Sequence, residues 1–156
     1  MLPAAIRGVR LERMSAPLTQ LAGGGDLCFL MCPDEPGRLA EASGLPLEAI
    51  SYAFAMDPNA ELGVAVAALR FPGVDTSRLI EIRLAAGSHS GKHMAEPQTI
   101  EVGTRTILWV TYGPFYNQYD NEYLYASGEV LFLISGWPPE AGEAPRDVAL
   151  AVGLLP

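Results

Sequence analysis

Residues 51–71 read SYAFAMDPNAELGVAVAALRF, two apolar runs with a polar turn between them. Residues 51–56 and 62–71 have the length and composition of strands, and the Asp57, Pro58 and Asn59 sequence is typical of a tight turn. The pattern predicts an antiparallel hairpin. Alanine is frequent in the second strand, which predicts that another part of the chain packs closely over it.

Two further hairpins are predicted downstream of this one. Residues 99–102 and 106–110 flank Gly103 and Thr104, while residues 122–126 and 129–134 are joined at Ser127 and Gly128. Alternating residues also predict a first strand over residues 7–13. Strands that follow one another through short turns pair antiparallel, so the sheet is expected to be mainly antiparallel.

Three helices are expected between and after these strands. The first opens with the acidic and proline residues 34–36, continues through residues 38–43 and is closed by Gly44. The second begins at cap candidates in residues 75–77 and runs to about residue 86, and the third covers residues 146–152. The sequence therefore predicts a single α+β domain over residues 1–156, a mainly antiparallel sheet with helices packed on one face.

The balance of charge limits the partners that the protein can have. The chain has 156 residues and a net charge of −8, from eighteen acidic and ten basic residues, and its one local basic cluster is Arg7, Arg10 and Arg13. A nucleic-acid surface normally requires a larger basic patch, so no nucleic-acid partner is expected. No apolar stretch reaches the length of about 18 residues that a membrane-spanning helix needs, so no membrane span is expected.

Few residues have the spacing of a catalytic or metal site. Cys28 and Cys32 favour two buried thiols over a disulfide, because residues four apart on a strand lie about 13 Å from each other. Residues 87–93 resemble a phosphate-binding loop but are one residue too short. His89 and His93 lack a third ligand in a segment that favours a loop. We therefore predict no catalytic residue, no metal site and no cofactor.

The most unusual segment is residues 112–125, YGPFYNQYDNEYLY, which holds five of the six tyrosines. Tyr123 and Tyr125 alternate as on one face of a strand. The residues before them are expected in a connecting loop, where aromatic rings and polar groups form good recognition surfaces. The predicted binding residues are Phe115, Tyr116, Asn117, Tyr119 and Asp120.

Three segments are similar to bacterial proteins of unknown function that are often exported or lipid-anchored. They are residues 2–11 (LPAAIRGVRL), 50–57 (ISYAFAMD) and 128–136 (GEVLFLISG). The resemblance implies an extracytoplasmic setting in preference to a cytoplasmic one. Residues 1–10 do not have the pattern of a signal peptide, so a lipid anchor is expected only if a leader has been removed.

Two functions are compatible with these patterns. The first is a non-catalytic binding or assembly module, in which the tyrosine-rich loop recognises a protein, a polymer or a second copy of the chain. The alternative is a small hydrolase or metal-dependent enzyme that uses His89, His93 and nearby acids, such as Asp57 or Asp120. The missing catalytic spacing and the aromatic loop favour the first, with a protein or self-association as the expected partner.

Overall fold

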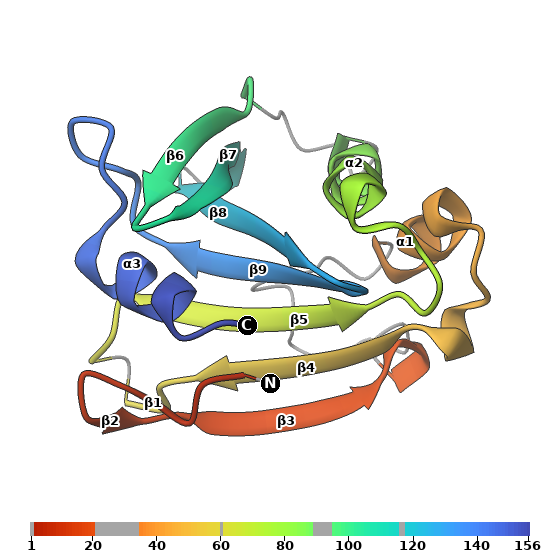
Figure 1. Cartoon of the computed structure of the whole chain (residues 1–156), viewed down its shortest axis with the longest axis horizontal. Helices are drawn as coiled ribbons and strands as arrows, with labels where there is room; N and C mark the ends of the chain where they lie inside the picture. Colours follow the sequence, from red (N-terminus) through yellow and green to blue (C-terminus); the bar gives the residue numbers. More distant parts are fainter. Residues whose placement is uncertain (1, 21–34, 60, 89–94, 116–117) are drawn as a thin grey trace.

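A seven-stranded antiparallel sheet is the centre of the computed structural model, which describes residues 2–20, 35–59, 61–88, 95–115 and 118–156 (Figure 1). A separate sheet of two short strands precedes it in the chain. The predicted α+β fold with a mainly antiparallel sheet is confirmed. In their order across the sheet the strands are β3 (Glu12–Pro17), β4 (Ser51–Met56), β5 (Val64–Arg70), β9 (Val130–Gly136), β8 (Gln118–Ser127), β7 (Arg105–Phe115) and β6 (Gln98–Val102). The separate two-stranded sheet consists of β1 (Ala5–Ile6) and β2 (Val9–Arg10).

The sheet consists of two meanders that meet at its centre. Strands β3, β4 and β5 are neighbours in chain order, as are β6, β7, β8 and β9. The meanders join where β5 pairs with β9, from Val64 opposite Gly136 to Arg70 opposite Val130. Each of the three predicted hairpins is present, as β4–β5, β6–β7 and β8–β9.

The turn between β4 and β5 is held by the side chain of Asp57. Its Oδ1 accepts the N–H of Asn59 at 2.9 Å, and its Oδ2 accepts the N–H groups of Glu61 and of Leu62, the latter at 2.9 Å. Asp57 is buried and engaged in this turn. Its carboxylate therefore accepts hydrogen bonds from backbone N–H groups for which the turn itself supplies no backbone acceptor.

Strand β9 is buried on both faces. Leu131 and Leu133 belong to an apolar cluster on one side of the sheet, and Phe132 and Ile134 belong to a second cluster on the other. All four side chains are at most 1% exposed. Because successive strand residues point to opposite faces, this run requires cover above and below the sheet.

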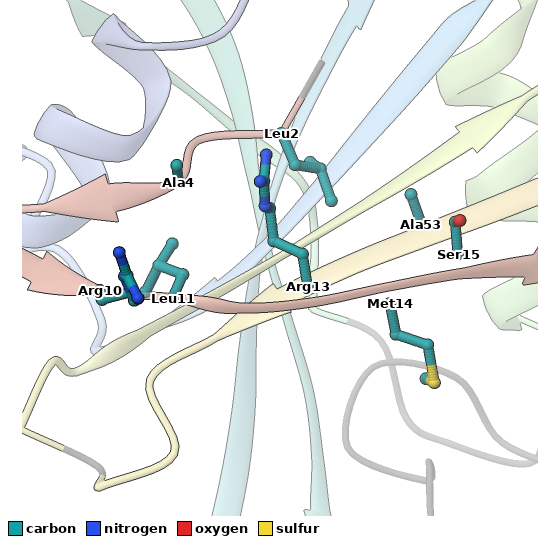
Figure 2. Close-up of a pocket in the computed structure, with 8 residues that line it drawn as sticks. All are labelled: Leu2, Ala4, Arg10, Leu11, Arg13, Met14, Ser15 and Ala53. Carbon is teal, nitrogen blue, oxygen red and sulfur yellow. The ribbon is translucent and has the colours of Figure 1, made fainter.

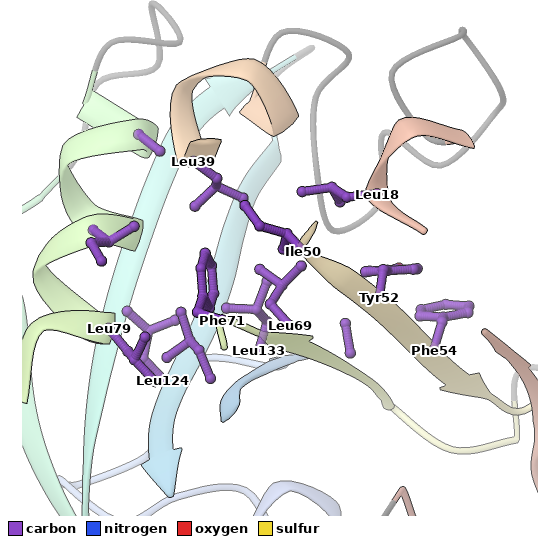
Figure 3. Packing of buried hydrophobic residues seen from close by; sticks show 14 of the residues in the cluster. Leu18, Leu39, Ile50, Tyr52, Phe54, Leu69, Phe71, Leu79, Leu124 and Leu133 are labelled. Carbon is purple, nitrogen blue, oxygen red and sulfur yellow. The ribbon is translucent and has the colours of Figure 1, made fainter. Parts of the chain in front are cut away.

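The helices supply that cover from both sides. Helices α1 (Glu35–Ser43) and α2 (Thr76–Ser88) pack on the face of Leu131 and Leu133, the cluster shown in Figure 3. Helix α3 (Arg146–Gly153) packs on the opposite face, where Val148, Ala151 and Val152 join the second cluster. The arrangement therefore differs from the expected one, in which all helices shared one face, because β9 needs apolar cover on both.

The ends of the helices follow their predicted signals. The Asp75 carboxylate accepts the N–H of Ser77 at 3.0 Å and so caps the start of α2. Gly44, directly after α1, has a φ of 70°, the left-handed conformation that closes a helix. Two short 3-10 turns, η1 (Leu18–Gln20) and η2 (Leu47–Ala49), complete the described helical elements, and none of the described helices has the length and apolarity required to cross a membrane.

The first strand lies later in the chain than predicted. Arg7 and Gly8 have φ values of 52° and 80°, so the chain turns there between β1 and β2. An extended strand cannot contain such residues, and the first strand of the main sheet is β3, over Glu12–Pro17, instead of residues 7–13.

Helix α3 lies close to the sheet at Gly136. A Cβ atom at this position would lie 2.6 Å from Cγ2 of Val148 and 3.4 Å from the backbone oxygen of Gly63. Neither neighbour can move freely, since one belongs to the packed face of α3 and the other is backbone. The absence of a side chain at Gly136 therefore sets the distance between α3 and β9.

We expect Gly136→Ala to destabilise the protein by about 1–3 kcal/mol, because the added methyl group overpacks this contact. The control is Gly37→Ala in α1, where a Cβ meets nothing within 4 Å. That change is expected to be neutral or to stabilise by up to about 1 kcal/mol, since alanine is the better helix former. Urea unfolding of both variants checks the difference; equal midpoints would contradict the described packing of α3.

Candidate functional site

The hairpin of β7 and β8 extends beyond both of its neighbours in the sheet. Strand β6 pairs with residues 105–109 of β7, and β9 pairs with residues 122–127 of β8. Residues 110–115 and 118–121 therefore form a two-stranded extension of the sheet, the β7–β8 ribbon, in which β7 and β8 pair with each other. Val110 and Tyr112 of this ribbon are buried in the cluster that α2 covers. A two-stranded ribbon is at best marginally stable in water by itself, so its position depends on side-chain contacts at its base.

On the face covered by α1 and α2, the base of the ribbon is held by a buried ionic cluster. Arg83 of α2 donates from Nε and Nη2 to Oε1 of Glu122 in β8, at 3.2 and 3.0 Å. Its Nη1 lies 3.5 Å from Oε2 of Glu35 in α1, and its guanidinium carbon lies 5.6 Å from the centre of the Tyr112 ring in β7. Arg83, Glu35 and Glu122 are each at most 5% exposed. The cluster thus joins α1, α2 and both strands of the ribbon.

Two carboxylates contact one guanidinium in this cluster. Burial raises the pKa of Glu122, and Arg83 opposes this shift without cancelling it. For Arg83, burial acts to lower the pKa, but Glu122 and Glu35 outweigh it and the net shift is upward. Burial raises the pKa of Tyr112 as well. The arginine is therefore always charged, the tyrosine is neutral, and Glu122 retains its proton to a higher pH than an exposed glutamate.

The opposite face of the ribbon is fixed by hydrogen bonds of neutral groups. Asn121 accepts through Oδ1 from the Trp109 indole N–H at 3.1 Å and from the Thr111 hydroxyl at 3.2 Å. The buried Tyr123 donates its hydroxyl to the backbone oxygen of Trp137 at 2.6 Å. Both faces at the base of the ribbon are therefore tied by buried or half-buried polar contacts.

A β-bulge lies between this base and the tip. Tyr112 pairs with Asp120 and Phe115 pairs with Gln118, so β7 has one more residue than β8 in this interval. Gly113, within the interval, has a φ of 142°, a conformation that favours glycine. Pro114 follows it in β7, and a proline in a strand is tolerated at such a bulge. Bulges increase the local twist and redirect the side chains beyond them.

The predicted binding residues lie at the far end of the ribbon. Phe115 is the last residue of β7, and Tyr119 and Asp120 belong to β8, where a connecting loop had been expected. Their side chains are outside the described part of the structure, and Tyr116 and Asn117 are outside the described residues altogether. Their role in binding stays a prediction.

The described structure does not test the alternative enzyme, because His89 and His93 lie outside the described residues. Of the acids considered with them, Asp57 is engaged in the β4–β5 turn. Cys28 and Cys32 also lie outside the described residues. Within the described residues, no three histidine, cysteine, aspartate or glutamate side chains are grouped so that they could hold a metal ion.

Comparison of the chain with protein-family models, with curated proteins and with solved structures found no match. The resemblance of residues 2–11, 50–57 and 128–136 to exported bacterial proteins therefore stays a prediction.

The ionic cluster was not predicted, although its signal is present in the sequence. Leu79, Ile82 and Ala86 are buried along α2 with the spacing of one helix face, and Arg83 lies on the same face. Glu122 precedes Leu124 by two residues and so points to the same side of β8. A charged residue at an apolar position of a helix and another on the facing strand could have been identified as an ion pair.

We expect Arg83→Met to destabilise the protein by about 3–5 kcal/mol, because it leaves two buried carboxylates without their cation. Arg78→Gln is the matched control, since Arg78 is on the same helix but exposed, and its effect should stay within about 0.5 kcal/mol. Chemical unfolding measures both. An Arg83→Met variant as stable as the Arg78→Gln control would show that the cluster does not hold the ribbon.

The raised pKa of Glu122 predicts a specific dependence of stability on pH. Because the folded protein binds this proton more tightly than the unfolded chain, the contribution of Glu122 is fully present below pH 4.5 and is lost as the pH rises through the higher folded value. Melting temperatures across this range should therefore fall more steeply for the native chain than for Glu122→Gln, which is neutral throughout. Glu81→Gln, an exposed change on α2, should retain the native slope; identical slopes for all three would refute the assignment.

Proposed function

We propose that this chain is a non-catalytic binding or assembly module that presents the tip of the β7–β8 ribbon to a partner. The observation that carries the proposal is the extension of β7 and β8 beyond β6 and β9, with a base that is fixed on both faces. A structural hairpin needs no such extension to complete the sheet. The partner is a protein, a polymer or a second copy of the chain.

The fixed base supports binding through its effect on entropy. A flexible loop loses conformational freedom when it binds, and this loss subtracts from affinity. The Arg83–Glu122 contact and the hydrogen bonds of Asn121 hold the two strands before any partner arrives. The base of the ribbon therefore loses its conformational entropy when the protein folds, and this loss does not subtract from the affinity for a partner.

The ionic cluster also supports a single register for the ribbon. A shift of β8 by one residue would move Glu122 to the opposite face of the sheet, away from Arg83. Such a shift would leave buried charges without partners, which is strongly unfavourable. The aromatic side chains at the tip would consequently be presented to a partner in a single register of the two strands.

Replacement of Phe115, Tyr116 and Tyr119 by serine tests the proposal. We expect association to be lost while the melting temperature is preserved, because interface aromatics can each contribute about 2 kcal/mol or more to binding and little to the isolated domain. The measurement combines light scattering of the purified chain over a concentration series with sizing of the tagged chain isolated from its own cells. Thermal melting is recorded on the same samples.

The matched control is Trp137→Ser, which removes a side chain that is 70% exposed and lies outside the ribbon. It should leave the assembly state unchanged. A triple variant that unfolds would instead place the three rings in the core. A triple variant that keeps both its melting temperature and its assembly state would refute recognition by the ribbon.

A further inference from the structure

A second surface lies at the opposite edge of the sheet, beside β3. An open hollow of about 710 Å³ lies between the N-terminal segment and this strand (Figure 2). Leu2 and Ala4 line one side of it, and Ser15 and Ala53 belong to its floor. We call this hollow the N-terminal groove. A neighbouring hollow of about 510 Å³ shares Leu2, Ser15 and Ala53 with it, so the groove continues across the sheet.

The charge of the N-terminal groove is opposite to that of the whole chain. Arg10 and Arg13 line the larger hollow, which has no acidic lining residue, while the neighbouring hollow is lined by one acid, Glu48, and one further arginine, Arg70. Neither arginine forms an ion pair with another described residue, whereas the nearby Arg7 is paired with Asp147 at 2.9 Å. In a chain of net charge −8, two adjacent cations without a partner in the described structure indicate attraction for an anionic group.

Strand β3 itself is open to pairing. It is the terminal strand of the sheet and pairs on one side with β4. Residues 12–15 are exposed whichever face they point to, and Figure 2 shows Arg13 on the groove side of the strand with Met14 on the other. Within the described structure, its outer edge therefore presents backbone N–H and C=O groups that a further strand could use.

We propose that β3 and the N-terminal groove bind an extended acidic segment of a partner protein, which adds to the sheet as another strand. Backbone hydrogen bonds to β3 would supply affinity, and alternate side chains of the segment would enter the groove. Carboxylates among them reach Arg10 and Arg13, while apolar groups contact Leu2 and Ala53. A long polyanion such as nucleic acid is disfavoured, because it would extend over the acidic remainder of the surface.

A blocked peptide of alternating valine and glutamate serves as the probe. Its affinity for the full chain is measured by fluorescence anisotropy, and the exchange of β3 amide protons by NMR. We expect binding that slows exchange in β3 and weakens as salt is added. The double variant Arg10→Gln/Arg13→Gln should bind the peptide more weakly by roughly tenfold or more, from the loss of charge-assisted contacts.

Four controls make the result specific. The variant Arg78→Gln/Arg146→Gln removes the same charge from exposed helix positions and should bind the peptide like the native chain. A peptide with glutamine in place of glutamate should bind weakly to every form. A peptide with proline at alternate positions cannot pair as a strand and should not protect β3. The triple serine variant of the ribbon should bind the acidic peptide normally, which separates this proposal from the preceding one.

Several outcomes would overturn the proposal. Equal binding of the glutamate and glutamine peptides would remove the role of charge, and equal binding of the proline peptide would remove strand addition. Binding of phosphatidylserine vesicles that depends on Arg10 and Arg13, without binding of the peptide, would assign the groove to a membrane surface. A dimer of the native chain that dissociates in the Arg10→Gln/Arg13→Gln variant would assign it to a second copy.

Discussion

Burial of β9 on both faces is the constraint on which the rest of the structure depends. Residues 131–134 are four consecutive apolar side chains with almost no exposure, two on each side of the sheet. Two layers must therefore cover this strand. Helices α1 and α2 form one layer, and α3 forms the other together with residues from the N-terminal segment such as Ile6 and Leu11. The close approach at Gly136 and the exposure of β3 follow from this arrangement, because the cover is concentrated over the centre and decreases toward the edge.

Much of this architecture could be predicted, because turn residues and alternation are local signals. The bounds predicted for β4 and for the helices are close to the observed bounds, because Asp57, Asp75 and Gly44 act through contacts with their own neighbours in the chain. The uninterrupted run in β9 was also a signal for cover on both faces. The continuation of β7 through Gly113 and Pro114 was not predictable in this way, because these residues ordinarily end a strand and here are accommodated by a bulge. The meeting of Glu35, Arg83 and Glu122 depends on how distant elements pack, and spacing alone did not reveal it.

The two proposed surfaces belong to different parts of the sheet and have different chemistry. The β7–β8 ribbon lies on β7 and β8, whereas the N-terminal groove lies on β3 at the far edge. The ribbon is tied to the core by buried polar contacts, and the groove combines an open strand edge with two arginines. Occupation of one surface would leave the other accessible, so a module of this design could connect two different partners.

The junction of β5 and β9 has a consequence for how the chain folds. The hairpins β4–β5, β6–β7, β7–β8 and β8–β9 pair strands that are close in sequence, so these contacts form with little loss of chain entropy, whereas β3 pairs with β4 across a longer segment, with Pro17 opposite Ser51. The junction instead brings together residues as distant in the chain as Arg70 and Val130. Contacts of long sequence separation slow folding, and the docking of the two meanders is therefore the expected slow step. Until it occurs, β5 and β9 are both unprotected edges with apolar side chains, and association between nascent chains would compete with completion of the sheet.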